Sequence, residues 1–215
     1  MKKDIAIIGL GTFGYELAIQ LTEYGHHILA IDIDEKKVNN IKDYVDVAVQ
    51  ADISDVEVLK QLEIYQFDIV IFAMSGNLEP IILAITYLKK MKAHKIIGKA
   101  NTRIKKEILL KIGADEVILP EISIAKQLAE KLSHPSFIDK IKIDKEISLW
   151  EVEIPENFTG KSLKQLDLRR KYNLNVIMKK NNSHTKINID PDEPFVKGEI
   201  VIVIGDEKNI KKVFK

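Results

Sequence analysis

The stretch IAIIGLGTFGYELAIQL, residues 5–21, decides the fold that this sequence predicts. An apolar run leads directly into glycines at positions 9, 11 and 14, and a helical pattern, Phe13–Tyr24, begins inside this glycine loop. Asp32 then closes the next apolar run, 23 positions after Gly9. A strand, a glycine-rich turn, a helix and a later carboxylate, in this order, are typical of a βαβ unit that binds a dinucleotide.

Each glycine has a separate physical role in such a unit. Gly9 permits the tight turn, Gly11 lets the backbone approach a pyrophosphate, and Gly14 lets the helix pack close to the strand. Thr12 and Phe13 stand between the glycines, where the positive N-terminus of the helix faces the phosphates. The alternative is that the glycines serve only a tight turn, which is common at strand ends in α/β proteins.

Alternating short β-branched runs and amphipathic patterns fill the first 133 residues. The expected strands are Ile5–Ile8, Ile28–Asp32, Val45–Val49, Ile69–Ala73, Lys95–Gly98 and Glu116–Leu119. The expected helices are Phe13–Tyr24, Asp34–Lys42, Asp55–Leu62, Leu78–Met91, Arg103–Ile112 and Ile122–Leu132. Connections of this length suit right-handed crossovers, and nearly continuous apolar strands suit a sheet covered on both faces. We therefore expect an α/β fold with a doubly wound parallel, Rossmann-like sheet over residues 1–134.

The pattern changes at Pro135, which disfavours helix at the residue before it and suggests a domain boundary. The elements expected after it are strand Ser148–Ile154, helix Leu163–Tyr172 with Ser162 as N-cap, a hairpin of strands Asn175–Lys179 and Lys186–Ile189, strand Ile200–Ile204, and a last short helix capped by Asp206. Residues 135–215 should therefore form a small α+β domain. Because such a module has a lean core, we expect one of its faces to be buried against a partner.

Further candidate contacts stand at the carboxyl ends of the expected strands, because ligands bind along that edge of an open α/β sheet. Asp32 is expected to accept hydrogen bonds from a ribose diol and to repel a 2′-phosphate. The other candidates are Ile33 after the second strand, Asp52 and Ile53 after the third, Ala73, Met74, Ser75, Gly76 and Asn77 after the fourth, and Lys99 after the fifth. Two alternatives stay open: Asp52 caps the helix that Ser54 starts, and Lys99 is a solvated surface lysine.

Composition narrows the classes of function. Lys and Arg (33) nearly balance Asp and Glu (32), and arginine is scarce, so we expect no nucleic-acid partner. The absence of cysteine excludes disulfides, thiolate catalysis and zinc–thiolate sites. The five histidines fit no metal-ligand spacing such as HExxH, and we expect no metal site. No tyrosine has a lysine four positions later, so the catalytic pair of short-chain dehydrogenases is missing, and we expect no catalytic residues.

The sequence also predicts a cytosolic protein. The most apolar region, Ile69–Leu88, is interrupted by polar residues and Pro80, whereas a membrane-spanning helix needs about 20 mostly apolar residues. The expected strand at Ile5 leaves no room for a signal peptide.

These stretches, in their order along the chain, resemble the regulator-of-potassium-conductance family, the cytosolic regulatory subunits of Ktr- and Trk-type potassium uptake systems. The matching stretches are IAIIGLGTFG (5–14), HHILAIDIDEKKVNNI (26–41), DIVIFAMSGN (68–77), IIGKANTRIKKEILLKIGADEVILPE (96–121), GKSLKQLDLRRKYNLNVIMKK (160–180) and VKGEIVIVIGDEKNIKKV (196–213). The run KIGADEVILPE is the most informative of these, because a generic dehydrogenase has no reason to carry it.

The resemblance implies a nucleotide-binding α/β domain followed by a small ligand-binding and dimerisation domain, without a catalytic centre. It implies that Lys99 and Glu121 face the nucleotide site or its subunit interface. ADP and ATP are the implied nucleotides. NAD or NADH is the alternative, because Ktr-type relatives often carry arginine where this chain has Thr12.

The resemblance also implies partners and a second ligand. Copies would pair and assemble, often as an octameric ring, on a separate membrane subunit that translocates potassium, which would place the protein at the inner face of the cell membrane. In Ktr-type relatives the C-terminal domain binds cyclic di-AMP, and SLKQLDLRRKY matches their pocket helix. This implies contacts from Leu163, Lys164 and Arg169. The alternative is that Arg169 and Arg170 form a solvated helix face.

Two rival functions remain at this point. An NAD-dependent oxidoreductase would share the glycine fingerprint, but it needs a larger domain to enclose hydride transfer. A redox-sensing transcriptional repressor would share the Rossmann core, but it needs a basic recognition helix, and none precedes Ile5.

Overall fold

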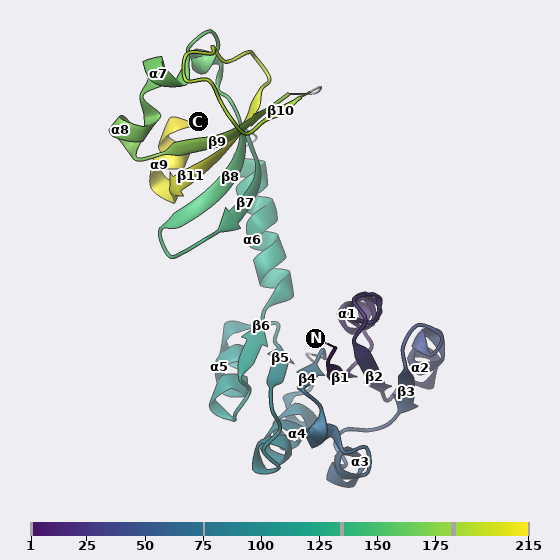
Figure 1. Ribbon diagram of the computed structural model, residues 1–215. Coiled ribbons are helices and arrows are strands. Elements are labelled where there is room, and N and C mark those ends of the chain that lie inside the picture. Colours follow the sequence, from purple (N-terminus) through teal and green to yellow (C-terminus); the bar gives the residue numbers. More distant parts are fainter. Residues whose placement is uncertain (1, 75, 134–135, 182–183, 215) are drawn as a thin grey trace. The chain divides into compact units, whose positions relative to one another are not determined.

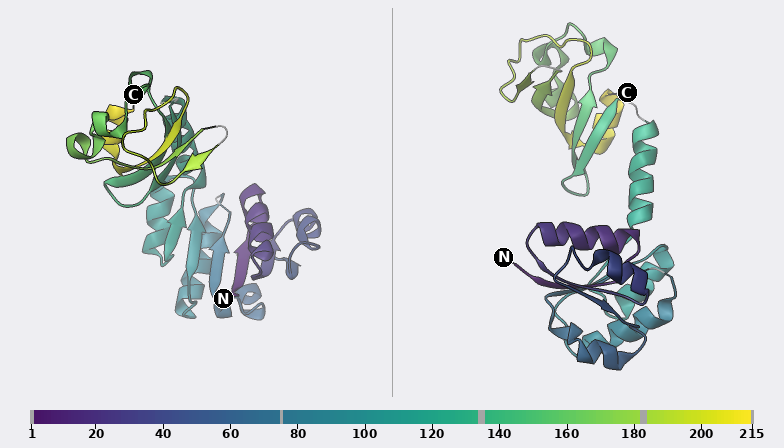
Figure 2. Two further views of the ribbon diagram at one scale, coloured as in Figure 1. Left: turned by 45° about the horizontal axis from the view of Figure 1, so that its top comes forward. Right: turned by 90° about the vertical axis from the view of Figure 1, so that its right-hand side faces the viewer.

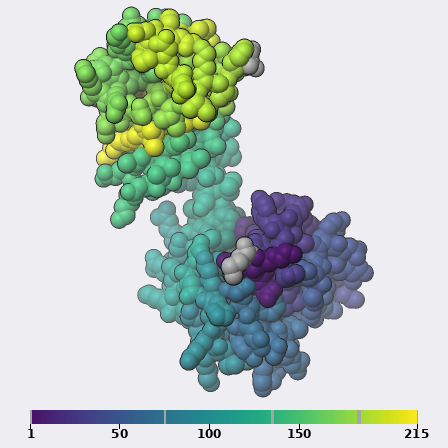
Figure 3. All heavy atoms as spheres, viewed as in Figure 1, coloured from purple at the N-terminus to yellow at the C-terminus, as the bar shows by residue number. Residues whose placement is uncertain are grey.

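The structure is a computed structural model that describes residues 2–74, 76–133, 136–181 and 184–214. The chain forms two compact units, residues 1–124 and 125–215 (Figures 1 and 3). They divide within helix α6 (Pro120–Ser133). The boundary suggested by the sequence rests on His134 and Pro135, which lie outside the described residues.

The N-terminal unit is built on a six-stranded parallel sheet, as the sequence predicts. Its strand order is β3-β2-β1-β4-β5-β6, the doubly wound order in which the chain reverses direction across the sheet between β1 and β4. The strands are β1 (Asp4–Ile8), β2 (His27–Asp32), β3 (Val47–Gln50), β4 (Ile69–Phe72), β5 (Ile96–Lys99) and β6 (Glu116–Ile118). Each begins and ends within two residues of its predicted bounds.

Helices cover both faces of this sheet (Figure 2). The helices α1 (Thr12–Glu23) and α2 (Glu35–Ile41) bury side chains in one apolar cluster. The second cluster, on the opposite face, contains side chains of α3 (Val56–Gln61), the 3-10 turn η1 (Ile64–Gln66), α4 (Leu78–Lys90) and α5 (Arg103–Lys111). Successive strand residues alternate between the clusters: Ile5 and Ile7 belong to the first, Ala6 and Ile8 to the second.

The sixth predicted helix differs from the other five. It runs as α6 from Pro120 to Ser133, and none of its residues is buried. The amphipathic pattern therefore identified the helix correctly, but α6 is not a crossover onto the sheet. Among the described residues, no helix is both long and apolar enough to cross a membrane.

The C-terminal unit contains a five-stranded antiparallel sheet of order β10-β9-β11-β8-β7. Its strands are β7 (Phe137–Lys142), β8 (Ile147–Glu153), β9 (Asn175–Lys180), β10 (Thr185–Lys186) and β11 (Ile200–Asp206). Its helices are η2 (Glu156–Phe158), α7 (Leu163–Leu166), α8 (Leu168–Tyr172) and α9 (Glu207–Val213). Both predicted N-caps are confirmed, Ser162 in a capping box with Gln165 and Asp206 through the N–H groups of Lys208 and Asn209.

Three predictions for this unit need correction. Strand β7 lies in a segment for which the sequence predicted no element. The single helix predicted over residues 163–172 is two short helices, because Asp167 between them adopts the left-handed conformation, with φ 50°. The predicted strand Lys186–Ile189 pairs with β9 only through Thr185 and Lys186 and then bends away, leaving Ile187 74% exposed.

Trp150 of β8 lies at the centre of this unit and is 1% exposed. The Phe137 ring meets it edge-on, with 4.5 Å between ring centroids. The ammonium groups of Lys140 and Lys211 lie over the indole, 4.7 and 5.6 Å from its centroid. Ammonium groups from β7 and α9 thus lie over the buried core tryptophan.

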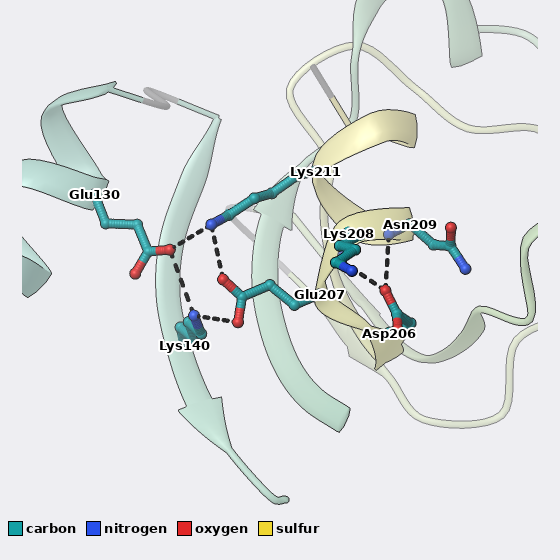
Figure 4. A network of polar contacts seen from close by, with 7 residues as sticks. All are labelled: Glu130, Lys140, Asp206, Glu207, Lys208, Asn209 and Lys211. Atoms are coloured by element: carbon teal, nitrogen blue, oxygen red, sulfur yellow. Dashed lines mark hydrogen bonds and ion pairs between the residues drawn. The ribbon is translucent and has the colours of Figure 1, made fainter. Parts of the chain in front are cut away.

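These two lysines also belong to a ring of four alternating charges (Figure 4). Lys140 Nζ lies 2.8 Å from Glu207 and 3.4 Å from Glu130, and Lys211 Nζ lies 2.7 and 2.8 Å from the same two carboxylates. Partial burial acts to raise the pKa of Glu207, but the hydrogen bonds from Lys140 and Lys211 outweigh it and lower the pKa to about 2. The ring ties α6, β7 and α9 together within the C-terminal unit.

Glu207→Gln is expected to destabilise the C-terminal unit at neutral pH and to flatten its pH dependence in acid. Because its pKa is lowered in the folded chain, the Glu207 carboxylate stabilises the fold above pH 4.5, and this contribution is lost as the pH falls towards about 2. Fluorescence of Trp150, the single tryptophan, measures unfolding of this unit. Glu156→Gln, which removes the exposed ion pair with Lys197, is the matched control and should change little. Identical acid-unfolding curves for wild type and Glu207→Gln would contradict the prediction.

Candidate nucleotide site

The glycine loop lies at the carboxyl end of β1, between the ends of β2 and β4. Gly9 has a φ of 99°, and a Cβ atom there would meet the Cβ and N atoms of Met74 at 3.0 Å. A Cβ on Gly14 would lie 1.9 Å from the carbonyl oxygen of Gly9. Both glycines are therefore required by the fold itself, Gly9 for the turn and Gly14 for the close approach of α1 to β1.

Gly11 differs from its two neighbours. Its φ is −68°, which any residue adopts, and a Cβ atom there would have no neighbour within 4 Å. Packing within the described chain gives no reason for glycine at this position. The small residue leaves open space in front of the first turn of α1, where the sequence analysis expects a pyrophosphate.

The N-terminus of α1 lacks the capping that the neighbouring helices have. The helices α2, α3, α4 and α5 begin after side chains whose oxygens accept first-turn N–H groups, namely Asp34, Asp55, Asn77 and Thr102. Helix α1 begins after Gly11, which has no side chain to offer, and its first turn contains no acidic residue. Its first-turn N–H groups and the positive end of its dipole can therefore bind an anion at this edge of the sheet.

Asp32 closes β2 beside the loop and is 7% exposed. Its carboxylate accepts hydrogen bonds from the N–H of Leu10 at 2.6 Å and of Asp34 at 2.9 Å. Burial acts to raise the pKa of Asp32, but these backbone hydrogen bonds and the ammonium of Lys37 together lower it. Asp32 is thus a charged acceptor held in place by the backbone of the glycine loop.

Lys37 of α2 is a neighbour of this carboxylate that the glycine fingerprint does not include. Its Nζ lies 3.2 and 3.4 Å from the two carboxylate oxygens of Asp32. The Lys37 side chain is 43% exposed, whereas that of Asp32 is 6% exposed, so the ammonium is the more movable partner. No spacing rule for the glycine fingerprint includes a lysine at this position, and only the packing of α2 brings it there.

The other predicted residues at this edge differ in their surroundings. Ile53 and Ala73 are buried in the core, Met74 packs against it, and Ile33 is 63% exposed. Asp52 accepts a hydrogen bond from the Ser54 N–H in the turn before α3, whose N-cap is Asp55, so the alternative in which Asp52 caps this helix is wrong. Asn77 caps α4, and the Gly76 carbonyl accepts a hydrogen bond from Lys105 Nζ at 3.0 Å. Ser75 lies outside the described residues.

Lys99 and Glu121 form an ion pair with each other. Lys99 Nζ lies 2.7 Å from the Glu121 carboxylate and 5.5 Å from the centroid of the Phe13 ring. The Lys99 side chain is only 11% exposed, which is low for an ordinary surface lysine. The hydrogen bond from Lys99 lowers the pKa of Glu121. Both residues therefore connect to the first turn of α1 through Phe13.

The three candidate contacts in the C-terminal unit lie on α7 and α8. Leu163 packs against the core of this unit, and Lys164 is paired with Asp192 at 3.0 Å. Arg169 and Arg170 are both exposed on α8. The left-handed Asp167 separates Lys164 from the arginines, so they do not share one continuous helix face.

A cleft of about 520 Å³ lies elsewhere on the N-terminal unit, at the amino ends of β1 and β2. Asp4, His27, Asp46 and Phe67 are among its lining residues, and none of the predicted contacts is. The described residues contain no group of three or more His, Cys, Asp or Glu side chains arranged to hold a metal ion.

Fold and loop geometry together define the N-terminal unit as a Rossmann-like domain with an anion-accepting helix terminus. Family models match both units: the TrkA-N domain over residues 5–120 and the TrkA-C domain over residues 149–215. Ktr system potassium uptake protein C of Bacillus subtilis (strain 168) is 35% identical over 215 residues, 100% of this chain and 97% of that protein. Ktr system potassium uptake protein A of the same strain is 31% identical over 211 residues, 98% and 95% of the two chains. The chain belongs to this family of TrkA-N and TrkA-C domain proteins, which confirms the resemblance that its motifs carry.

Solved structures show the same fold. The GsuK channel superposes with a TM-score of 0.66 at 13% identity, and the likeness covers 98% of this chain but 38% of the channel chain. The crystal structure of the GsuK RCK domain superposes with a TM-score of 0.57 at 21% identity, over 98% of this chain and 45% of that chain.

Gly11→Thr is expected to leave the stability of the ligand-free chain nearly unchanged, whereas Gly14→Ala is expected to lower it. Threonine is a favoured N-cap residue and meets no atom at position 11, so the unfolding midpoint should stay within about 2 °C of wild type. Alanine at position 14 forces α1 away from Gly9, at a cost of about 2–3 kcal/mol, or roughly 4–12 °C. Differential scanning calorimetry of the ligand-free chain measures both. A large loss of stability in Gly11→Thr would mean that Gly11 serves the turn.

Proposed function

We propose that this chain is a nucleotide-sensing regulatory subunit of a potassium uptake system and controls a separate membrane subunit that translocates the ion. Membership of the family that includes the Ktr potassium uptake proteins A and C supports the assignment to a potassium uptake system. The uncapped N-terminus of α1 in front of the open space at Gly11 is the observation that carries the nucleotide site. In this proposal residues 1–134 bind the nucleotide, and residues 135–215 bind a second ligand and dimerise.

The site suits an adenine nucleotide with an unmodified ribose. The diphosphate would lie against the first turn of α1, and the ribose diol would bind Asp32. Leu10 and Asp34 already donate to this carboxylate, so the diol takes the place of the Lys37 ammonium. ADP and ATP are the proposed nucleotides and NAD the alternative; the GsuK channel, a structural relative at 21% identity, has been determined bound to NAD.

Control of a partner requires two states with different nucleotide affinities. A nucleotide that bound both states equally would shift nothing, whatever its affinity. Lys99 and Glu121 are proposed to transmit the difference, because their ion pair touches Phe13 in the first turn of α1. We propose that eight chains, paired as dimers, form a ring in the cytoplasm at the inner face of the membrane.

An enzymatic function has less support. The relatives reported above carry the names of potassium uptake proteins. Binding alone explains the glycine loop, and Tyr15, the tyrosine beside it in the sequence, donates its hydroxyl to the carbonyl oxygen of Asn40. Oxidation of NADH or NADPH by the purified chain with a panel of carbonyl compounds would favour the oxidoreductase alternative.

Cyclic di-AMP is the second ligand that we propose, at a two-fold symmetric cleft between C-terminal units. Arg169 is exposed and can hold phosphate oxygens in the two-pronged geometry that lysine cannot reproduce. Leu163 and Lys164 would line the same cleft, with Lys164 released from Asp192.

Asp32→Asn is expected to weaken nucleotide binding roughly ten- to hundredfold, the effect of losing about 1.5–3 kcal/mol of hydrogen bonding to a charged group. Asparagine keeps the size of the side chain and one acceptor oxygen for the buried Leu10 N–H. Asp46→Asn is the matched control, because Asp46 likewise accepts a backbone N–H, that of Ile28 in β2, but at the opposite edge of the sheet.

Mass spectrometry of the denatured protein identifies the nucleotide that copurifies, and isothermal titration calorimetry of the stripped chain measures its affinity. Gly11→Thr should abolish this binding without loss of stability. The proposed function fails if no nucleotide copurifies and ADP, ATP and NADH all give no heat of binding.

Arg169→Lys is expected to weaken binding of cyclic di-AMP to the full chain at least tenfold, whereas Arg170→Lys should change it less than twofold. Equilibrium dialysis measures both the affinity and the stoichiometry, for which we expect one dinucleotide per two chains. Equal effects of the two substitutions, or no binding, would exclude this site and leave the arginines as a solvated helix face.

A further inference from the structure

A cleft in the C-terminal unit carries charge that neither the nucleotide site nor the proposed cyclic di-AMP site uses. It has a volume of about 640 Å³ and lies between η2, the pair α7–α8 and the end of α9. Its size is that of ordinary small-molecule sites. Leu163, Lys164 and Arg169 are not among its lining residues, so it is a different surface of α7 and α8.

All charged residues that line this cleft are cationic. Lys161, Lys171 and Lys212 line it, and no aspartate or glutamate does. Among the described residues, none of these three ammonium groups has a carboxylate within ion-pair distance. By contrast, Lys164 on the same pair of helices is paired with Asp192, and Lys211, next to Lys212, is paired with Glu130 and Glu207.

Local helix electrostatics explains only part of this arrangement. Lys171 and Lys212 stand in the last turns of α8 and α9, where the helix dipole favours a cation. That effect acts on each helix separately. It does not account for the convergence of two helix ends on one cleft, nor for Lys161 on the loop before α7 at the same rim. A cleft lined by one sign of charge with apolar walls concentrates the opposite charge.

The remaining lining residues suit a compact anion with an apolar side. Phe158 and Leu168 are buried and form apolar walls, and the Tyr172 ring lies 5.9 Å from Lys212 Nζ. Gln165 uses its Oε1 atom in the capping box with Ser162, which leaves its amide N–H groups as donors.

We propose that this cleft, which we name the lysine cleft and define by Lys161, Lys171 and Lys212, binds a small molecule carrying two or more phosphate groups. Three ammonium groups match a multiply charged phosphate better than a single carboxylate or a monovalent anion. The site lies within one C-terminal unit and is independent of the nucleotide site.

Lysine footprinting of the full chain tests the proposal with inorganic pyrophosphate as the probe. The chain is labelled with limiting acetic anhydride at constant ionic strength, with and without pyrophosphate, and mass spectrometry measures acetylation at each lysine. Labelling of the three cleft lysines should fall at least fivefold. Lys142 and Lys145, which are exposed on the same unit, should stay within 1.5-fold. Orthophosphate should need at least tenfold higher concentration for the same protection.

A matched pair of variants tests the specific contacts. In Lys171→Met, the pyrophosphate concentration that half-protects Lys161 should rise at least tenfold, whereas in Lys164→Met it should not change. Because the readout is residue by residue, pyrophosphate bound at the glycine loop does not interfere with it. No protection of the cleft lysines, or equal protection of Lys142 and Lys145, would overturn the proposal, and so would equal effects of the two substitutions.

Discussion

The contact between Gly14 and the carbonyl oxygen of Gly9 is the constraint on which the N-terminal unit depends. It holds the first turn of α1 so close to the end of β1 that no side chain fits between them. The helix axis is thereby fixed against the sheet at the point where the chain reverses direction between β1 and β4. The same contact directs the uncapped N–H groups of α1 to the edge where Asp32 ends β2. One glycine-to-backbone approach therefore determines both the packing of α1 and the position of its uncapped N-terminus.

Differences in burial explain why the strands of the N-terminal unit could be predicted from the sequence more accurately than those of the C-terminal unit. Strands of the parallel sheet are covered on both faces, so they appear as continuous apolar runs such as Ile69–Phe72, and their bounds could be predicted within two residues. Strand β7 has the sequence FIDKIK, and its charged residues interrupt the apolar run that marks the strands of the parallel sheet. Only Phe137 of this strand is buried, and Lys140 contacts the core by placing its ammonium over the Trp150 ring while pairing with Glu207. Hydrophobic periodicity cannot predict a contact between a lysine ammonium and a buried aromatic ring.

Local backbone conformation set a second limit on prediction. No glycine or proline marks the break at Asp167. This residue nevertheless adopts the left-handed conformation, which aspartate tolerates better than most residues, and it thereby divides the expected helix into α7 and α8. In the candidate site, the fingerprint correctly assigned the tight turn to Gly9 and the close helix packing to Gly14, whereas the role of Gly11 towards a pyrophosphate stays a prediction. It could not predict Lys37 on Asp32, or the approach of Lys99 to Phe13, because these contacts depend on how α1, α2 and β5 are placed against one another.

The missing cap on α1 has a further consequence for the dynamics of the unit. Four neighbouring helices of the unit have a first-turn N–H group bound by the side chain of their N-cap residue, whereas the N-cap of α1, Gly11, offers no such acceptor. In the free chain, amide protons there would exchange with solvent through local fraying rather than global unfolding. An anion that accepts hydrogen bonds from these N–H groups would suppress the fraying. Ligand binding would therefore make the N-terminal end of α1 more rigid. With glycine at position 11 the chain itself supplies no side-chain acceptor at this helix end, so a nucleotide bound as proposed would complete the local structure with its own phosphate oxygens.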